Sequence, residues 1–452
     1  MKIHSFFVLA LLLFSSPSFA ETVLDIYNLA LVNDPEYLAA IEIENATEEE
    51  LSIALANYLP TVTLSANGSQ SDSTSDTTLP PAPSADPPRL TETTVTRSTK
   101  PKSTGYGAQL SLPLYNYTNF VLSDIADASV LQAQANLVTA RHKLIIKVAV
   151  RYFTVLAGED GVGFAKAELE SIARQLDQTK QRFDVGLVAI TDVHEAQARY
   201  DLSLATGIQA ENDLANARES LREVTGRYHD NLAHLLEDTP LLEPKPANID
   251  KWTDLAIKQS FIIRSVAQGI TIAKENINFA RAGYYPRLNL TVNYDANVNE
   301  SDSIFIKKSD STGTSANLNL SYSLYEGGAT RSRVRQAGFQ LSQAKQNLEQ
   351  ARRSVQRTAR ESYMNVIAGI SRVKALKQAV ISRESAQSAT EAGFEVGTKT
   401  TVDVLISRRE LFFSQNSHAQ ARYTLVIDNL KLRQAAGDVS AQDLEQITNW
   451  LK

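Results

Sequence analysis

The sequence carries one structural unit twice, and this internal duplication restricts the possible folds more than any other feature. At a shift of 211 residues, the segment Phe-Asp-Val-Gly at 183–186 returns as Phe-Glu-Val-Gly at 394–397. Self-similarity at a fixed shift is typical of chains built from repeated supersecondary units. We therefore expect two structural repeats, 21–237 and 251–452, joined by a linker at 238–250 that contains three prolines.

A seven-residue apolar pattern runs through the middle of each repeat. In the second repeat Val334, Leu341 and Leu348 recur at this interval, and an alanine follows each of them by three residues. Such a pattern predicts a coiled-coil seam whose alanines let the helices approach closely. Long helices are expected at about 120–184 and about 330–395. A helix of about 65 residues would be roughly 98 Å long, which no ordinary globular domain requires.

Each long helix is expected to end at a glycine turn, marked by Gly186 and Gly397. Returning helices should follow at about 192–226 and about 403–437, and a shorter helix should begin each repeat. This order of elements predicts a mainly α-helical chain with a small β part.

Each repeat also carries two short runs in which apolar and polar residues alternate. Strands are expected at about 61–68 and 105–115 in the first repeat and at about 287–295 and 316–325 in the second. Runs of this length with a neutral polar face fit strands of a transmembrane barrel, apolar toward lipid and polar toward a wet lumen. An amphipathic sheet on a soluble core would produce the same alternation.

The first repeat holds a longer insert, residues 69–104, between its two strands. Serine, threonine and proline dominate this segment. Such a composition supplies no core, and proline cannot donate to a sheet ladder. We expect a solvated, outward-facing loop without strands, with Pro83 near its middle.

Residues 1–20 have the composition of a secretory signal peptide. Lys2 precedes an apolar run at 6–14, and Ala20 completes a small-residue cleavage site before Glu21. The run is shorter than the ~20 residues that a membrane-spanning helix needs. No later apolar stretch reaches that length, so strands are expected to make any membrane crossing.

Composition excludes several classes of function. The net charge of −6 argues against a nucleic-acid partner, which normally requires a basic face. The absence of cysteine excludes a thiol nucleophile, a Cys-ligated metal, disulfides and a lipidated N-terminal cysteine. The six histidines have no ligand spacing, and we expect no catalytic site, metal or cofactor.

The strand count predicts an oligomer if the strands cross a membrane. One chain offers four strands, and an open edge in lipid would leave backbone groups unpaired. The smallest common barrels have about eight strands. Two chains would give eight strands and three would give twelve, so the count alone leaves the number of subunits open.

Two segments, 174–193 and 392–405, resemble the two helical tips of the TolC family of outer-membrane channels, and the order of elements is similar over 21–452. The resemblance implies a homotrimer in the outer membrane. Its twelve-stranded β-barrel would be shared between subunits, above a coiled-coil barrel of twelve helices in the periplasm. It also implies an exit duct for tripartite efflux or type I secretion, with a periplasmic adaptor protein and an inner-membrane pump or ABC exporter as partners.

The same resemblance implies a gate formed by contacts between the two tip turns. By motif position, Thr191 and Asp192 would bond to Lys399. Phe394 stands where the family has a tyrosine whose hydroxyl reaches the glutamine matched to Gln181. Lysine in place of the family's arginine replaces a bidentate fork with a point charge. Both departures predict a gate that is held less tightly.

Asp403 matches an aspartate that rings the pore constriction in the family. A second aspartate follows it there by three residues, where this chain has Ile406. A ring of carboxylates in a narrow pore favours cations. The alternative for both Asp192 and Asp403 is helix N-capping, since an aspartate at a helix start accepts backbone N–H bonds.

The tip turns are the expected docking site for the adaptor, through Val185, Gly186, Leu187, Val396, Gly397 and Thr398. A trimeric surface adhesin or structural coiled coil is the alternative function, although its strands should form one terminal anchor instead of lying inside both repeats. A periplasmic enzyme or binding protein is a third hypothesis, and it lacks candidate site residues.

Overall fold

The computed structural model describes residues 20–81, 91–236, 238–300 and 307–452. The predicted signal peptide lies outside the described residues except for Ala20, and the predicted loop around Pro83 lies outside them as well. The described chain is mostly helical with a small β part, as the sequence predicts.

Both repeats show the same order of elements. The first contains α1 (Val23–Asn33), α2 (Pro35–Ala56), β1 (Thr61–Gln70), β4 (Lys102–Asn116), α3 (Tyr117–Asp184) and α4 (Ile190–Thr225). The second contains α5 (Ile249–Gln259), α6 (Phe261–Arg281), the 3₁₀ turn η1 (Ala282–Tyr284), β5 (Arg287–Glu300), β6 (Lys308–Ser321), α7 (Ala329–Glu395) and α8 (Thr401–Ala436). The short helix α9 (Ala441–Thr448) follows, and the hairpin β2 (Ser73–Leu79) and β3 (Thr93–Thr99) lies within the first repeat.

The spatial units of the chain do not follow the repeats. One unit comprises the described residues up to Glu44 together with Ala133–Val266 and Asn347–Lys452. The other comprises Asn45–Gln132 and Ala267–Gln346. Each unit therefore combines corresponding segments of both repeats, and the two long helices contribute to both units.

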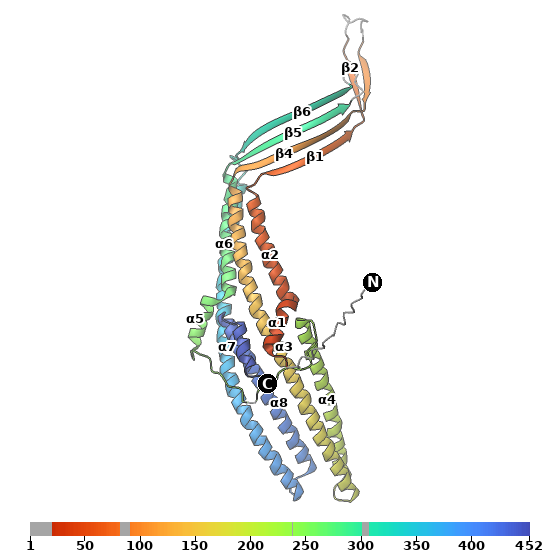
Figure 1. Cartoon of the computed structure of the whole chain (residues 1–452), viewed down its shortest axis with the longest axis vertical. Coiled ribbons are helices and arrows are strands. Elements are labelled where there is room, and N and C mark those ends of the chain that lie inside the picture. Colours follow the sequence, from red (N-terminus) through yellow and green to blue (C-terminus); the bar gives the residue numbers. More distant parts are fainter. Residues whose placement is uncertain (1–19, 82–90, 237, 301–306) are drawn as a thin grey trace, which may run out of the picture. The chain divides into compact units, whose positions relative to one another are not determined.

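The second unit contains an antiparallel sheet in the order β1-β4-β5-β6 (Figure 1). The central pair joins the two repeats, with Leu110 opposite Val292 and Ala108 opposite Tyr294. Every residue of β1 and of β6 is exposed in the single chain. Among the described strands, β1 and β6 each have a partner on one side only.

The prediction that 69–104 is a loop without strands was wrong. Strands β2 and β3 pair from Ser73–Thr99 to Leu79–Thr93, and β4 begins at Lys102. The paired stretches are rich in threonine, a β-branched residue that favours strands, and they contain no proline. The hydroxyls of Thr78 and Thr94 lie 3.3 Å apart across the hairpin.

Strand β6 also departs from the predicted range of 316–325. It begins at Lys308 because the polar segment that precedes the alternating run still pairs with β5, from Lys308 opposite Glu300 onward. It ends at Ser321, which lies opposite Arg287, the first residue of β5, so later residues have no partner strand.

The first unit is a set of helices around an apolar core. Tyr152 and Phe153 of α3 are almost fully buried there, together with Leu221 of α4. Phe153 stacks on Tyr423 of α8 at 5.7 Å between ring centroids. The buried Tyr152 hydroxyl donates to the carbonyl of Ala233 at 2.7 Å. None of the helices in the described residues has both the length and the apolar composition of a membrane span.

Candidate functional site

The two helix pairs of the first unit end in turns of the same construction (Figure 1). Gly186, after α3, and Gly397, after α7, adopt left-handed φ values of 77° and 80°. The amide of Leu187 donates to the carbonyl of Arg182, and the amide of Thr398 donates to that of Gly393, both at 2.8 Å. These bonds satisfy carbonyls that a helix end leaves free, and the left-handed residue is one that glycine supplies without strain.

The residues beside these glycines are apolar and exposed. Val185 and Leu187 flank the first glycine, Val396 precedes the second, and more than two thirds of each side chain is accessible to solvent. Exposed apolar groups gathered at one place mark a surface that another molecule covers. Docking of an adaptor at these turns stays a prediction.

The structure places Asp403 in a capping box at the start of α8. Its carboxylate accepts bonds from the backbone amide and the hydroxyl of Thr400, both at 2.9 Å, and its own amide donates to that hydroxyl at 3.2 Å. These bonds, and the nearby charge of Lys399, lower the pKa of Asp403. Asp192 accepts a longer bond, 3.3 Å, from the amide of Ala189, which has no side-chain acceptor to complete a box. Both aspartates thus act as helix caps.

The residues of the predicted clasp do not meet within one chain. In the described part of the chain, neither Asp192 nor Lys399 forms an ion pair, and Thr191 lies next to Asp192 in the first turn of α4. The predicted contact of Thr191 and Asp192 with Lys399 is thus absent from the described part of the single chain, and it stays a prediction for the assembled gate. Ile406 is exposed and lies in the second turn of α8.

Gln181 has a partner of its own, because its amide donates to Asp177 on the same helix at 2.8 Å. Gln175, by contrast, has an unpaired side-chain donor. It is 2% exposed, and its Nε2 has no acceptor among the described residues. Gln175 and Phe394 line the same groove between α3 and α7. The guanidinium of Arg182 lies over the Phe394 ring, 4.4 Å from its centroid.

Sequence reasoning missed Gln175, although the heptad pattern held a signal for it. Gln175 and Arg182 are seven residues apart and therefore share a face of α3. Gln181 lines the same groove, so both glutamines border the groove that contains Phe394.

Arg408 of α8 was also missed, and it contacts two other helices. Its Nη1 donates to the carbonyl of Ser171 at 3.2 Å and to the Ser171 hydroxyl at 2.9 Å. Its Nε donates to Glu391 of α7 at 2.8 Å. No motif marks this arginine in the sequence, because its significance depends on tertiary contacts.

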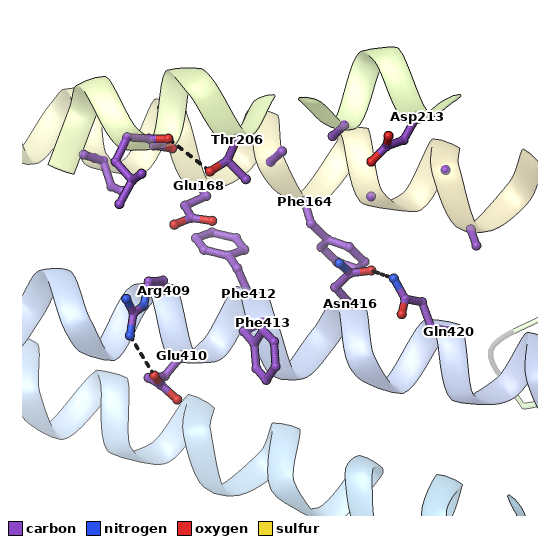
Figure 2. Close-up of a pocket in the computed structure, with 18 of the residues that line it drawn as sticks. Phe164, Glu168, Thr206, Asp213, Arg409, Glu410, Phe412, Phe413, Asn416 and Gln420 are labelled. Atoms are coloured by element: carbon purple, nitrogen blue, oxygen red, sulfur yellow. Dashed lines mark hydrogen bonds and ion pairs between the residues drawn. The ribbon is translucent and has the colours of Figure 1, made fainter. Parts of the chain in front are cut away.

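A second groove lies between the α3–α4 pair and α8. Figure 2 shows Phe412 of α8 pointing toward Glu168 of α3, with Phe164 of α3 farther along the same groove. Burial raises the pKa of Glu168, and the charge of Arg409 partly opposes this shift. The groove therefore combines aromatic rings with a weakly acidic carboxyl. Across the described residues, no group of three or more His, Cys, Asp or Glu side chains could hold a metal ion.

Comparison with known proteins finds a family match in two segments of the chain. A model of the family described as outer membrane efflux protein matches residues 26–227 and 252–438. Outer membrane protein TolC of Vibrio cholerae is 36% identical over 445 residues, covering 97% of this chain and 95% of that protein. TolC of Escherichia coli K12 is 33% identical over 449 residues, covering 97% of this chain and 86% of that protein.

A secretion protein and solved channel structures are also similar to this chain. The alkaline protease secretion protein AprF of Pseudomonas aeruginosa is 26% identical over 445 residues, covering 97% of this chain and 89% of that protein. The structure of the CmeC outer membrane channel of Campylobacter jejuni aligns with a TM-score of 0.74 at 16% identity, covering 96% of this chain and 90% of that chain. The open-state MtrE outer membrane channel of Neisseria gonorrhoeae aligns with a TM-score of 0.69 at 18% identity, covering 93% and 90%. At these identities the structural likeness shows the fold.

Proposed function

The chain belongs to the outer membrane efflux protein family, and we propose that it forms a homotrimeric exit duct, gated at its periplasmic tips, for efflux or type I secretion. It is an outer-membrane protein, and its relatives are named as membrane and secretion proteins, not as enzymes. The family match favours this duct over the alternative of a trimeric surface adhesin.

The sheet is the observation that carries the proposal. Strands β1 and β6 are edges, and all their side chains are exposed in one chain. Lipid cannot satisfy the backbone groups of an open edge, so the edges of three chains would pair to close a twelve-stranded barrel. Its outer face would meet outer-membrane lipid.

The helix pairs support a tunnel in the same assembly. Helices α3 and α7 have 68 and 67 residues, and each returns through a helix of 36 residues. Three chains would place six such pairs around one axis, which gives twelve helices in cross-section.

The proposed partners are a periplasmic adaptor protein and an inner-membrane pump or ABC exporter. Support comes from relatives named for secretion, among them AprF and the proteases secretion protein PrtF of Dickeya chrysanthemi. The adaptor would cover the exposed apolar turns at Val185, Leu187 and Val396. The residues within and around these turns, Gly186, Gly397 and Thr398, would set their shape.

Reconstitution into planar lipid bilayers tests the proposal. The purified protein should insert and give single conductance steps with cation selectivity, whereas an adhesin or a periplasmic enzyme should give none. In cells, deletion of the gene should reduce efflux or protein secretion, and the wild-type chain should restore it. A purified oligomer that never conducts would overturn the duct.

A further inference from the structure

Arg408 fastens three helices together close to the tips. Its guanidinium donates two bonds to Ser171 of α3, and it pairs with Glu391 of α7, with Nη2 only 2.7 Å from Oε1. The Arg408 side chain is 19% exposed. Hydrogen bonds that involve an ionised group are stronger than neutral ones, and solvent screens them less in a half-buried place.

The arginine lies one helical turn beyond an apolar anchor on the same helix. Leu405 is buried against Ile172 and Leu176 of α3 and against Ala196 of α4. Together, Leu405 and Arg408 attach the start of α8 to the α3–α4 pair. Leu405 supplies non-directional apolar contact, whereas the bonds of Arg408 require one position of α8 relative to α3.

Among the described residues, the cation–π contact and the other ion pair near the tips are weaker links or lie within one helix pair. The contact between Arg182 and the Phe394 ring joins α3 to α7, but an exposed cation–π contact contributes only about 0.5–1 kcal/mol. The pair of Arg383 and Glu410 joins α7 to α8 and does not reach α3.

We infer that Arg408 restrains the gate by holding the α7–α8 pair against the α3–α4 pair in the closed channel, an inference that rests on the proposed function. If the two pairs separate, Glu391 travels with Arg408, because a short turn connects α7 to α8. The bonds to Ser171 must then break. Glu391 is thus a positioning residue that orients the guanidinium. The bonds between Arg408 and Ser171 are the ones that break when the gate opens.

This restraint offsets the two departures at the turns. Phe394 lacks a hydroxyl and Lys399 lacks a bidentate fork, yet Arg408 supplies a fork about two helical turns further along α8. The main restraint on the gate would therefore lie in the helices, at Arg408, instead of in the tip turns.

Bilayer recordings of Arg408→Gln and Arg409→Gln trimers test the inference. Loss of the charge-assisted bonds should raise the resting conductance of Arg408→Gln about tenfold. Arg409→Gln is the matched control, since Arg409 is 49% exposed and, among the described residues, its ion pair is with Glu410 of its own helix. Its charge acts on Glu168 of α3 without a hydrogen bond between them in the described residues, so the conductance of this variant should equal that of the wild type. Arg408→Lys should give an intermediate value, because a point charge cannot serve both helices.

A charge exchange separates the contact with α3 from the pair within α7–α8. The combination of Arg408→Glu, Glu391→Arg and Ser171→Ala keeps an ion pair between α7 and α8. It removes the Ser171 hydroxyl, which could donate to the new carboxylate, and leaves that carboxylate against a backbone carbonyl of α3. These trimers should remain as leaky as Arg408→Gln. Recovery of wild-type conductance would show that the α7–α8 pair alone matters, and the inference would be wrong.

The outcomes also separate this inference from the proposed function. If wild-type trimers do not conduct, the duct itself is wrong. If they conduct and Arg408→Gln, Arg408→Lys and Arg409→Gln behave like the wild type, the duct stands and the restraint by Arg408 is refuted. Arg408→Lys and the exchange variant retain charge at this place, so they test the restraint even if Arg408→Gln fails to assemble.

Discussion

Asp403 is a helix cap in the single chain, and the proposed trimer would give its charge a second role. We predict that Asp403→Ala removes both the cation selectivity and the block by multivalent cations, because it removes the ring of carboxylates. Thr400→Ala is the matched control: it breaks the capping box and leaves the charge, so block should persist at neutral pH. If Asp403→Ala leaves selectivity and block unchanged, the aspartate serves only as a cap.

The same pair of variants predicts a pH dependence. The bonds from Thr400 favour the ionised carboxylate and lower the pKa of Asp403 below its ordinary value of 3.8. Thr400→Ala removes the hydroxyl bond, so the pKa of Asp403 in this variant should be higher than in the wild type. As the pH falls, the cation block should therefore disappear earlier in Thr400→Ala, as measured by conductance with a fixed concentration of a multivalent cation.

The groove lined by Phe394 also holds a buried donor, the Nε2 of Gln175, which has no partner among the described residues, and this suggests a gain-of-contact variant. Phe394→Tyr should lower the resting conductance about fivefold, because a hydroxyl in this groove would accept a bond from the Nε2 of Gln175. The variant keeps the aromatic ring under Arg182. In the double variant Phe394→Tyr/Gln175→Leu the effect should vanish. An equal reduction in both variants would show that the hydroxyl acts elsewhere.

At the scale of elements, the helices were more predictable than the strands. The heptad pattern extends over many turns and predicts a mainly helical chain, because each turn repeats the same apolar face. The hairpin β2–β3 has no apolar face, so alternation could not reveal it, and only threonine content favoured a strand there. The start of β6 was missed for the same reason, since its residues are polar and show no apolar alternation.

In the candidate site, too, some features could be predicted from the sequence and others could not. The glycine turns and the acidic caps follow from local motifs, and the structure has them at Gly186, Gly397, Asp192 and Asp403. Arg408 could not be identified, because its partners lie 237 and 17 residues away along the chain. Local sequence predicts turns and caps, but contacts between helices require the packed structure.

The hairpin β2–β3 provides a test of orientation. The chain has no cysteine, so a single engineered thiol can be labelled specifically. Ser75→Cys on β2 should react with a membrane-impermeant maleimide on intact cells. Leu187→Cys at a tip turn should react only after the outer membrane is permeabilised. Labelling of Leu187→Cys alone on intact cells would mean that the chain is inserted the other way round.

At the scale of the whole molecule, duplication and assembly are connected. Each repeat contributes two strands to one sheet and one pair of antiparallel helices to the other unit. The duplication thus supplies two copies of each part per chain, and three chains would supply six. Closure then depends on a single kind of new contact, β1 of one subunit against β6 of the next.

Cross-linking of that contact in native membranes tests the account most directly. Cysteines would be placed one at a time along β1, for example Val62→Cys and Leu64→Cys, each combined with Leu318→Cys on β6. Paired positions should oxidise to disulfides between chains, and single-cysteine variants should not. We predict a ladder of covalent species that ends at three chains, because a closed ring of three has no further edge. A ladder that ends at two chains, one that continues beyond three, or the absence of any cross-link across the whole panel would contradict the shared trimeric barrel.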